Sequence, residues 1–252
     1  MSRHFRLRSA SVTHAGLVRS QNEDSLLARD DAGVWAVADG MGGHVNGQWA
    51  SSEIVAELST AALVGEFDAD LTQIAAAIQS ANHRIFSAGQ ERSQSMGSTI
   101  VTLYISGDCF SCFWVGDSRV YLLRDEQLHR MTRDHTKVQE MVSSGLLSEA
   151  EAHNHPMSHV LSRAVGVEPE VEIEAVSDML QPRDLFLLCS DGLSGVVSDA
   201  EIVELLVRHD AGVACEHLLE LVLERGAPDN VTMIAVSCEE ATALMARASL
   251  SS

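Results

Sequence analysis

Strand-like segments in this chain come in consecutive groups, and the helical patterns form a separate group. The apolar segments 99–105, 109–115 and 120–124 follow one another directly, whereas helical patterns gather over 48–89. A doubly wound parallel sheet would require strict alternation of strands and helices, which this sequence lacks. The grouping therefore predicts an α+β fold in which antiparallel sheet is covered by helices on its outside.

Periodicity and capping signals predict further elements. Apolar residues with helical spacing from Leu71 to Ile85 predict a half-buried helix. Ser198 and Glu201 have the spacing of a capping box. The helix that follows them would bury Ile202, Leu205 and Leu206. Additional strands are expected at four short apolar runs, 26–28, 34–38, 185–189 and 232–237.

Acidic residues outnumber basic ones in this chain. The 252 residues include 36 Asp and Glu against 17 Lys and Arg, which gives a formal charge of −19. We therefore expect neither a nucleic acid nor a membrane as partner, because no basic patch would outweigh that field. Lys137 is the only lysine, so the Gly-Lys pair of a phosphate-binding loop does not occur. Without linkers or repeats, the length predicts one domain over 1–252.

The N-terminus and the cysteines bear on the compartment of the protein. The basic start, Arg3 to Arg8, lacks the apolar stretch of a signal peptide. No apolar run is longer than five residues, far short of a membrane span. The five cysteines are an odd number, and a strand would point Cys109 and Cys112 to opposite faces. We therefore expect free thiols and a cytoplasmic protein.

Four aspartates stand at the ends of apolar, strand-like runs. Asp39 and Asp191 each follow such a run and precede a glycine, Asp117 follows Phe-Trp-Val-Gly, and Asp229 stands just before the last run. A partly desolvated carboxylate is costly unless it is paired or coordinated, and cations are scarce here. Oxygen ligands without His or Cys favour Mg²⁺ or Mn²⁺ over zinc. The alternative is that each of these aspartates merely forms a turn.

The glycine-rich stretch Asp39-Gly-Met-Gly-Gly-His44 is one of six ordered sequence blocks. The others are Arg19-Ser-Gln-Asn-Glu-Asp-Ser25, Gly97-Ser-Thr99, Val115-Gly-Asp-Ser-Arg119, Ser190-Asp-Gly-Leu193 and Asp229-Asn230. Together they resemble the metal-dependent serine/threonine protein phosphatases of type 2C, particularly the compact bacterial members. The resemblance extends over residues 10–236.

The resemblance implies a four-layer α/β/β/α sandwich of two antiparallel sheets flanked by helices, with metal ions at one end. It implies that Asp39 bridges two Mn²⁺ or Mg²⁺ ions and that the Gly40 carbonyl binds one of them. Arg19 matches the phosphate-binding arginine of the family, which grips two phosphoryl oxygens. The other implied ligands are Asp191 and Asp229 at the first ion, Glu23 and Asp24 at the second, largely through water, and Asp117 with Asp191 at a third, weaker ion.

The implied activity is that of a phosphoric monoester hydrolase. It would hydrolyse phosphoserine and phosphothreonine in proteins with a metal-activated water, opposing a bacterial Ser/Thr kinase. Met41 stands where eukaryotic members carry the His proposed as general acid, and a thioether donates no proton. His44 and a metal-bound water are therefore the candidates for protonating the leaving alkoxide. By resemblance, segment 143–165 is a flap beside the site, and nothing in the sequence indicates more than a monomer.

Other chemistries fit the residues less well. No cysteine is followed by an arginine at the spacing of a cysteine phosphatase. Asp68-Ala-Asp-Leu-Thr72 matches the Asp-x-Asp-x-Thr of haloacid-dehalogenase-type hydrolases, but the helical pattern from Leu71 favours acids at a helix start. His153, His155 and His159 are interpreted as solvated flap histidines. A non-enzymatic binding module of the same fold is the last alternative, and the retained metal acids argue against it.

Overall fold

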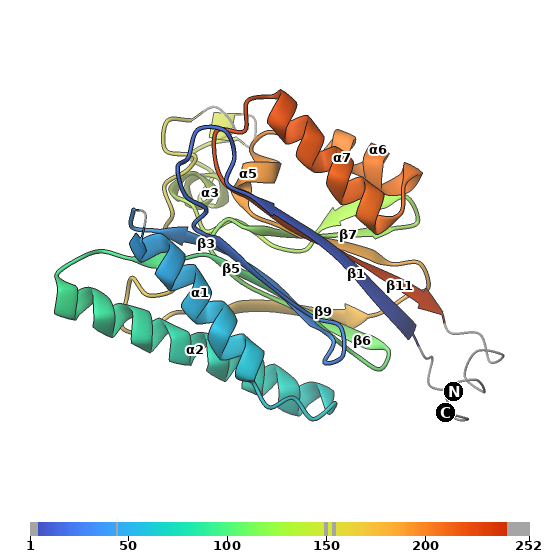
Figure 1. The fold of residues 1–252 in the computed structure, drawn as a ribbon, viewed down its shortest axis with the longest axis horizontal. Coiled ribbons are helices and arrows are strands. Elements are labelled where there is room, and N and C mark those ends of the chain that lie inside the picture. Colours follow the sequence, from blue (N-terminus) through green and yellow to red (C-terminus); the bar gives the residue numbers. More distant parts are fainter. Residues whose placement is uncertain (1–4, 44, 149–150, 153–154, 241–252) are drawn as a thin grey trace.

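Two antiparallel sheets lie face to face between two layers of helices (Figure 1). The computed structural model describes residues 5–43, 45–148, 151–152 and 155–240. In spatial order, the first sheet consists of β1 (Phe5–His14), β11 (Val231–Glu240), β10 (Leu185–Cys189), β7 (Arg119–Arg124) and β8 (Gln127–Arg130). The second consists of β2 (Asp24–Arg29), β3 (Val34–Met41), β5 (Ile100–Ser106), β6 (Cys109–Val115) and β9 (Glu174–Met179), with β4 (Gly97–Ser98) paired to β3.

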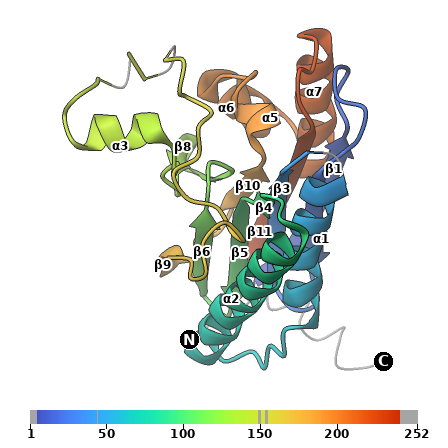
Figure 2. The ribbon, with the colours of Figure 1, turned by 90° about the vertical axis from the view of Figure 1, so that its left-hand side faces the viewer.

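The helices cover the outer faces of both sheets. Helices α1 (Val45–Thr60) and α2 (Phe67–Arg92) lie on the second sheet. The first sheet is covered by α5 (Asp191–Ser194), α6 (Asp199–Arg208) and α7 (Ala211–Glu224). Figure 2 shows α3 (Lys137–Ser143) beside the sandwich, on the side of β8. The predicted α+β fold with two antiparallel sheets flanked by helices is therefore confirmed.

Three apolar cores separate the four layers. In β3, Ala36 packs toward α1 and α2, whereas Trp35 faces the opposite sheet. Between the sheets, Phe110 and Phe186 meet edge to face with ring centroids 4.8 Å apart. On its other face, β10 packs Leu187 under α6 and α7. Because β3 and β10 are buried on both faces, the residues at their ends are held on a rigid frame.

Most predicted elements occur, and apart from the two-residue β4 the strands that the sequence did not predict lie at sheet edges. Segments 109–115 and 185–189 coincide with β6 and β10. The edge strands β1, β8 and β9 were not predicted. Each has only one neighbouring strand and an exposed or alternating burial pattern, so none carries a continuous apolar run.

The predicted helix starts agree with the structure. Helix α6 begins after Ser198, whose backbone N–H donates to Glu201 Oε2 at 3.0 Å in a capping box. Helix α2 begins at Phe67 and has Asp68 and Asp70 in its first turn. Asp68 and Asp70 therefore lie at a helix start and not at the strand end that the nucleophile of an Asp-x-Asp-x-Thr hydrolase needs, and Asp70 is buried and accepts backbone hydrogen bonds there.

The cysteines and the helix lengths bear on two further expectations. All five cysteines are free, and Cys112 is buried between the sheets while Cys109 is half-buried near a strand end. The expectation of free thiols is confirmed. None of the helices in the described part of the chain combines the length and apolarity that a membrane span needs.

Candidate active site

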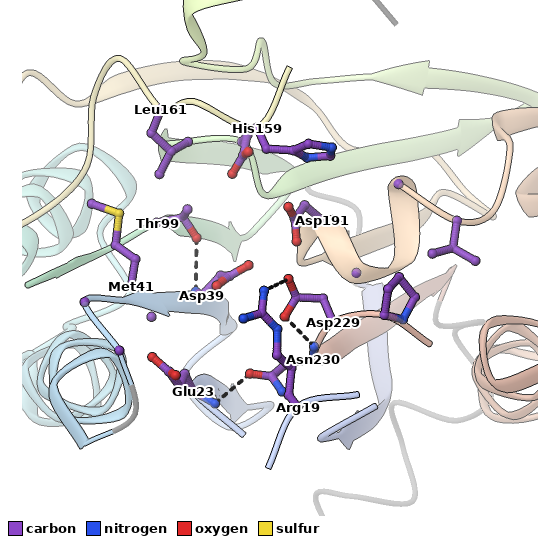
Figure 3. Close-up of a pocket in the computed structure, with 18 residues that line it drawn as sticks. Arg19, Glu23, Asp39, Met41, Thr99, His159, Leu161, Asp191, Asp229 and Asn230 are labelled. Carbon is purple, nitrogen blue, oxygen red and sulfur yellow. Dashed lines mark hydrogen bonds and ion pairs between the residues drawn. The ribbon is translucent and has the colours of Figure 1, made fainter. Parts of the chain in front are cut away.

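A cavity of about 850 Å³ opens where strands of both sheets end (Figure 3). Asp39 comes from β3, Asp117 follows β6, Asp191 follows β10 and Asp229 precedes β11. All four line this one cavity, as the strand-end pattern predicts. The other described residues predicted for the site that line it are Arg19, Glu23 and Gly40.

The backbone of Asp39 is fixed by hydrogen bonds on both sides. Its N–H donates to the Thr99 hydroxyl at 3.0 Å, and its carbonyl accepts from the Ser98 hydroxyl at 2.8 Å. The Thr99 N–H also donates to the Asp39 carbonyl, at 2.9 Å. The hydroxyls of Thr99 and Ser118 lie 2.7 Å apart, which ties Asp39 to the turn that carries Asp117. These contacts hold two of the aspartates in a fixed relation.

Burial, and after it the crowding of carboxylates, raises the pKa values of the cavity aspartates. Burial, followed by the charges of neighbouring aspartates, raises the pKa of Asp39 well above its ordinary value. Burial and then the charge of Asp191 raise the pKa of Asp117 to about 8. The pKa of Asp191 is raised as well, by burial and then by Asp229. Without a cation, the cluster therefore retains protons that metal binding would release.

Asp24 lies behind the cavity wall. It is the residue of β2 that pairs with Asp39 of β3, but unlike the other described residues predicted for the site it does not line the cavity. Its Oδ2 accepts a hydrogen bond from the Ser190 hydroxyl at 2.8 Å. Its Oδ1 is buried and has no hydrogen-bond partner among the described residues. Burial is the main cause that raises the pKa of Asp24 to about 7.

Glu23 is positioned by its backbone and by two glycines. Its N–H donates to Asn230 Oδ1 at 2.8 Å, and its carbonyl accepts from the Gly40 N–H at 3.2 Å and the Ser51 hydroxyl at 2.5 Å. A Cβ on Gly47 would come within 1.9 Å of the Glu23 carboxylate, and a Cβ on Gly40 within 2.1 Å of the Gly47 carbonyl. Only glycine at both positions allows this close approach of α1 to β3.

Arg19 lies at the cavity mouth and forms an ion pair with Asp229. Its Nη2 is 2.7 Å from Asp229 Oδ2, and Asp229 Oδ1 accepts the N–H of Asn230 at 2.8 Å. The hydrogen bond to Asp229 and the charge of that carboxylate raise the pKa of Arg19. The side chains of Arg19 and Asp229 are 56% and 37% exposed, so water screens the pair strongly.

The cavity offers many anionic oxygens and few cations. Five carboxylates line it, those of Glu23 and the four strand-end aspartates, and Arg19 is the only arginine or lysine among its described lining residues. This all-oxygen donor set, with the unpartnered Oδ1 of Asp24 behind it, fits Mn²⁺ or Mg²⁺ by its chemistry. Among the described residues, however, no three His, Cys, Asp or Glu side chains are arranged as a closed metal site. Both Asp229 oxygens accept hydrogen bonds, one from Arg19 and the other from the Asn230 N–H.

Comparison with models of known protein families identifies the family of this chain. The family model of protein phosphatase 2C matches residues 14–229, which include the lining residues from Arg19 to Asp229. The chain belongs to the protein phosphatase 2C family. The resemblance predicted from the six sequence blocks is therefore confirmed.

Curated relatives of this chain include proteins named serine/threonine phosphatases. PstP of Mycobacterium tuberculosis is 38% identical over 238 residues, which make up 90% of this chain but only 44% of PstP. This chain thus spans less than half the length of that relative. The stp phosphatase of Listeria monocytogenes is 34% identical over 235 residues, which cover 89% of this chain and 93% of the relative.

Solved structures with the fold of this chain include PppA and the catalytic domain of PstP. PppA, described as a key regulatory component of T6SS in Pseudomonas aeruginosa, aligns with a TM-score of 0.87 and 39% identity, covering 94% of this chain and all of that one. The catalytic domain of PstP, solved in complex with two manganese ions, aligns with a TM-score of 0.84 and 36% identity over 94% of this chain and all of that one.

Some residues of this 2C-family cavity were not predicted as site residues. Asn230 lies in a motif of the sequence, but its side chain also donates to the carbonyls of Ala15 and Gln21, at 2.9 Å each, which no spacing reveals. His159, interpreted from the sequence as a solvated flap histidine, is exposed and lines the cavity above Asp191 (Figure 3). His44 and His153 lie outside the described residues.

Proposed function

We propose that this chain is a metal-dependent phosphoric monoester hydrolase that dephosphorylates phosphoserine and phosphothreonine in proteins. The observation that carries the proposal is the meeting of five carboxylates and one arginine in a single cavity of a 2C-family chain. The names of PstP and stp support the substrate class. The two manganese ions in the PstP structure support the choice of cation.

The carboxylates are proposed to hold two Mn²⁺ or Mg²⁺ ions, and a third, weaker one. When bound, the ions supply a water of lowered pKa and neutralise charge on the phosphoryl group. Asp39 would be shared between two ions, with the Gly40 carbonyl beside it. The remaining proposed ligands are Asp191 and Asp229 for the first ion, Glu23 and Asp24 for the second, largely through water, and Asp117 with Asp191 for the third.

Arg19 is proposed to bind the phosphoryl group. A guanidinium suits two phosphoryl oxygens at once, and this one already holds a carboxylate at the cavity mouth. Because the pair with Asp229 is exposed and screened, a phosphate dianion is expected to replace that carboxylate readily. The same exchange would free Asp229 to bind a cation.

His44, which lies outside the described residues, is proposed to protonate the leaving alkoxide. Met41 lines the cavity but has no proton to give, and a metal-bound water is the alternative donor. His44→Ala is expected to slow phosphopeptides more than aryl phosphates, because a phenolate leaves without a proton. Equal slowing of both substrates would remove His44 from this role.

The central experiment is phosphate release from a phosphothreonine peptide. We expect turnover with Mn²⁺ or Mg²⁺, none after chelation, and a loss of at least ~10³-fold in Asp39→Ala. Undiminished turnover in Asp39→Ala would overturn the mechanism. Binding of the peptide without any turnover would favour the non-enzymatic module instead.

The proposal also covers the setting of the reaction. We propose phosphorylated proteins as substrates, a Ser/Thr kinase as the opposing enzyme, a cytoplasmic location and a monomeric state. Segment 143–165 is proposed to act as a flap within a single domain. In support of this, its residues His159 and Leu161 line the cavity.

A further inference from the structure

A second hollow, of about 330 Å³, adjoins the candidate active site. Met41 and Leu161 line both cavities, so they form the boundary between them. Apolar side chains of Ala164, Val167 and Val171 line the rest of the hollow together with polar ones. A peptide with its phosphorylated residue in the main cavity can therefore extend into this hollow, which we call the side groove.

The backbone that forms the side groove is held in place by buried contacts. Val165 and Ser98 exchange two backbone hydrogen bonds, of 3.0 and 2.9 Å. The fully buried Asn82 of α2 accepts from the Gly166 N–H at 2.6 Å and donates to the carbonyls of Glu168 and Pro169 at 3.1 and 3.2 Å. The side groove is therefore preformed, and a ligand need not order it.

Arg163, the one arginine or lysine among the described residues that line the side groove, is already neutralised. Arg163 Nη2 lies 2.9 Å from Glu172 Oε2, and Arg163 Nη1 lies 3.2 Å from Glu174 Oε1. Two carboxylates thus face one guanidinium, which leaves this corner of the groove net negative. Arg163 consequently offers little attraction to an acidic ligand.

Two further carboxylates of the side groove are available to a ligand. Glu168 and Glu170 are exposed, and their side chains make no hydrogen bond or ion pair with any residue in the described part of the chain. Their charges stand at the edge of an apolar floor. A lysine or arginine side chain matches this arrangement, because its methylene stem packs on apolar surface while its charged head reaches the carboxylates.

We propose that the side groove binds the substrate chain next to the phosphorylated residue and selects a basic side chain there. The inference rests on the proposed function, since it needs the phosphoryl group in the main cavity. Exposed ion pairs of this kind contribute little each, so two of them predict a preference of ~3- to 10-fold in kcat/KM for a basic over a neutral residue. An acidic residue at the same position is expected to be the poorest.

The test is a panel of phosphothreonine peptides, each with Arg, Gln or Glu at one position on either side of the phosphothreonine. With the full chain and Mn²⁺, we expect one flanking position at which Arg gives the highest kcat/KM, mainly through a lower KM. Glu168→Gln combined with Glu170→Gln is expected to remove that preference. The matched control, Glu216→Gln with Glu220→Gln on α7, removes the same charge from the opposite helical layer and is expected to preserve it.

The outcomes separate this inference from the proposed function. Turnover of all peptides at equal rates would overturn the basic preference and leave the phosphatase proposal intact. A preference that survives the Glu168 and Glu170 changes, or that the α7 control also abolishes, would show that the side groove is not its source. Absence of Mn²⁺-dependent turnover of every peptide and of an aryl phosphate would overturn the function and the inference together.

Discussion

Arg19 and Asp229 form an ion pair at the mouth of the cavity, with 2.7 Å between Nη2 and Oδ2. In the proposed function these residues have different ligands, a phosphoryl group for Arg19 and a cation for Asp229. Exposed pairs such as this one contribute only ~0–1 kcal/mol to stability, so either ligand separates them at small cost. The pair therefore keeps an arginine at the cavity mouth without blocking the site.

Arg19→Ala is expected to separate catalysis from metal binding. Without the guanidinium, kcat/KM for a phosphopeptide is expected to fall by ~10²-fold or more, because the charge-assisted contacts to the phosphoryl oxygens are lost. Mn²⁺ affinity is expected to stay constant or rise by no more than ~5-fold, since Asp229 loses only an exposed partner. Titration calorimetry and steady-state kinetics on one preparation measure both. As a control, Arg19→Lys keeps the charge and is expected to recover only part of kcat/KM. A weaker Mn²⁺ affinity in Arg19→Ala than in the wild type would contradict this account.

Asp39→Asn is expected to stabilise the protein in chelator while abolishing turnover. Burial and the neighbouring carboxylates raise the pKa of Asp39, so its ionised form disfavours the folded state. Asn is neutral and has the same shape, which predicts a gain of ~1–2 kcal/mol, or roughly 3–6 °C in melting temperature. The gain is expected to grow as the pH rises above about 4, where the unfolded carboxyl ionises, and to vanish below it.

Metal is expected to reverse this order of stability. Saturating Mn²⁺ is expected to raise the melting temperature of the wild type and to leave that of Asp39→Asn almost unchanged, because a ligand stabilises only the state that binds it. Thermal denaturation at several pH values, with chelator and with Mn²⁺, measures both effects. A less stable Asp39→Asn protein at pH 8 in chelator would show that the carboxylate cluster is not a source of strain.

Asp70→Ala is expected to destabilise the fold without changing turnover per folded molecule. The carboxylate of Asp70 is fully buried and accepts from the N–H groups of Val64 and Gly65, at 2.8 Å each, and from the Tyr104 hydroxyl. Removing it leaves three donors without their acceptor, a loss of ~3 kcal/mol or more. Chemical denaturation and kinetics measure the two properties. Asp68→Ala, at an exposed position of the same motif, is the control and is expected to cost under ~1 kcal/mol.

The sequence predicted the interior of the sandwich better than its edges, for a physical reason. Strands β6 and β10 are buried on both faces, so they appear as almost wholly apolar runs, with Ser111 the one polar residue in β6, and with their correct ends. The edge strand β9 contains Glu174, Ser177 and Asp178, and it pairs only with β6. The residues that pair across β6 and β9, such as Cys112 and Val176, lie about sixty positions apart in sequence. No local sequence pattern indicates such a contact.

In the candidate site, strand ends were predictable and loop contacts were not. The convergence of Asp39 and Asp191 follows from their positions after buried strands. The hydrogen bond between Asp24 and Ser190, behind the cavity wall, depends on how the two sheets face each other. The pairing of Arg19 with Asp229 depends on the position of the loop that carries Arg19. Asn230, more than 200 residues away in sequence, holds this loop by hydrogen bonds to its carbonyls. Such side-chain contacts arise only when both sheets are assembled.

His135 connects the turn of Asp117 to β9 through its imidazole ring. Nδ1 accepts the Gly116 N–H at 3.1 Å, so the proton is on Nε2, which lies 3.0 Å from Glu174 Oε1. The backbone N–H of His135 also donates to the Gly116 carbonyl, at 2.9 Å. Burial is the main cause that lowers the pKa of His135, and the neutral ring is the form that this pair of hydrogen bonds needs. We therefore expect His135 to act as a positioning residue for the proposed third metal site.

Two substitutions of His135 test its two side-chain hydrogen bonds one at a time. The amide oxygen of His135→Asn lies near the place of Nδ1 and retains an acceptor for Gly116, whereas the amide of His135→Gln reaches toward Glu174 and leaves Gly116 without one. We expect His135→Gln to weaken the weakest Mn²⁺ site by ~10-fold or more and His135→Asn to weaken it much less. Electron paramagnetic resonance of bound Mn²⁺ measures this independently of turnover, and melting temperatures report the fold. Equal losses in the two variants would mean that the ring contributes only packing, such as its stacking on Trp114 at 6.3 Å.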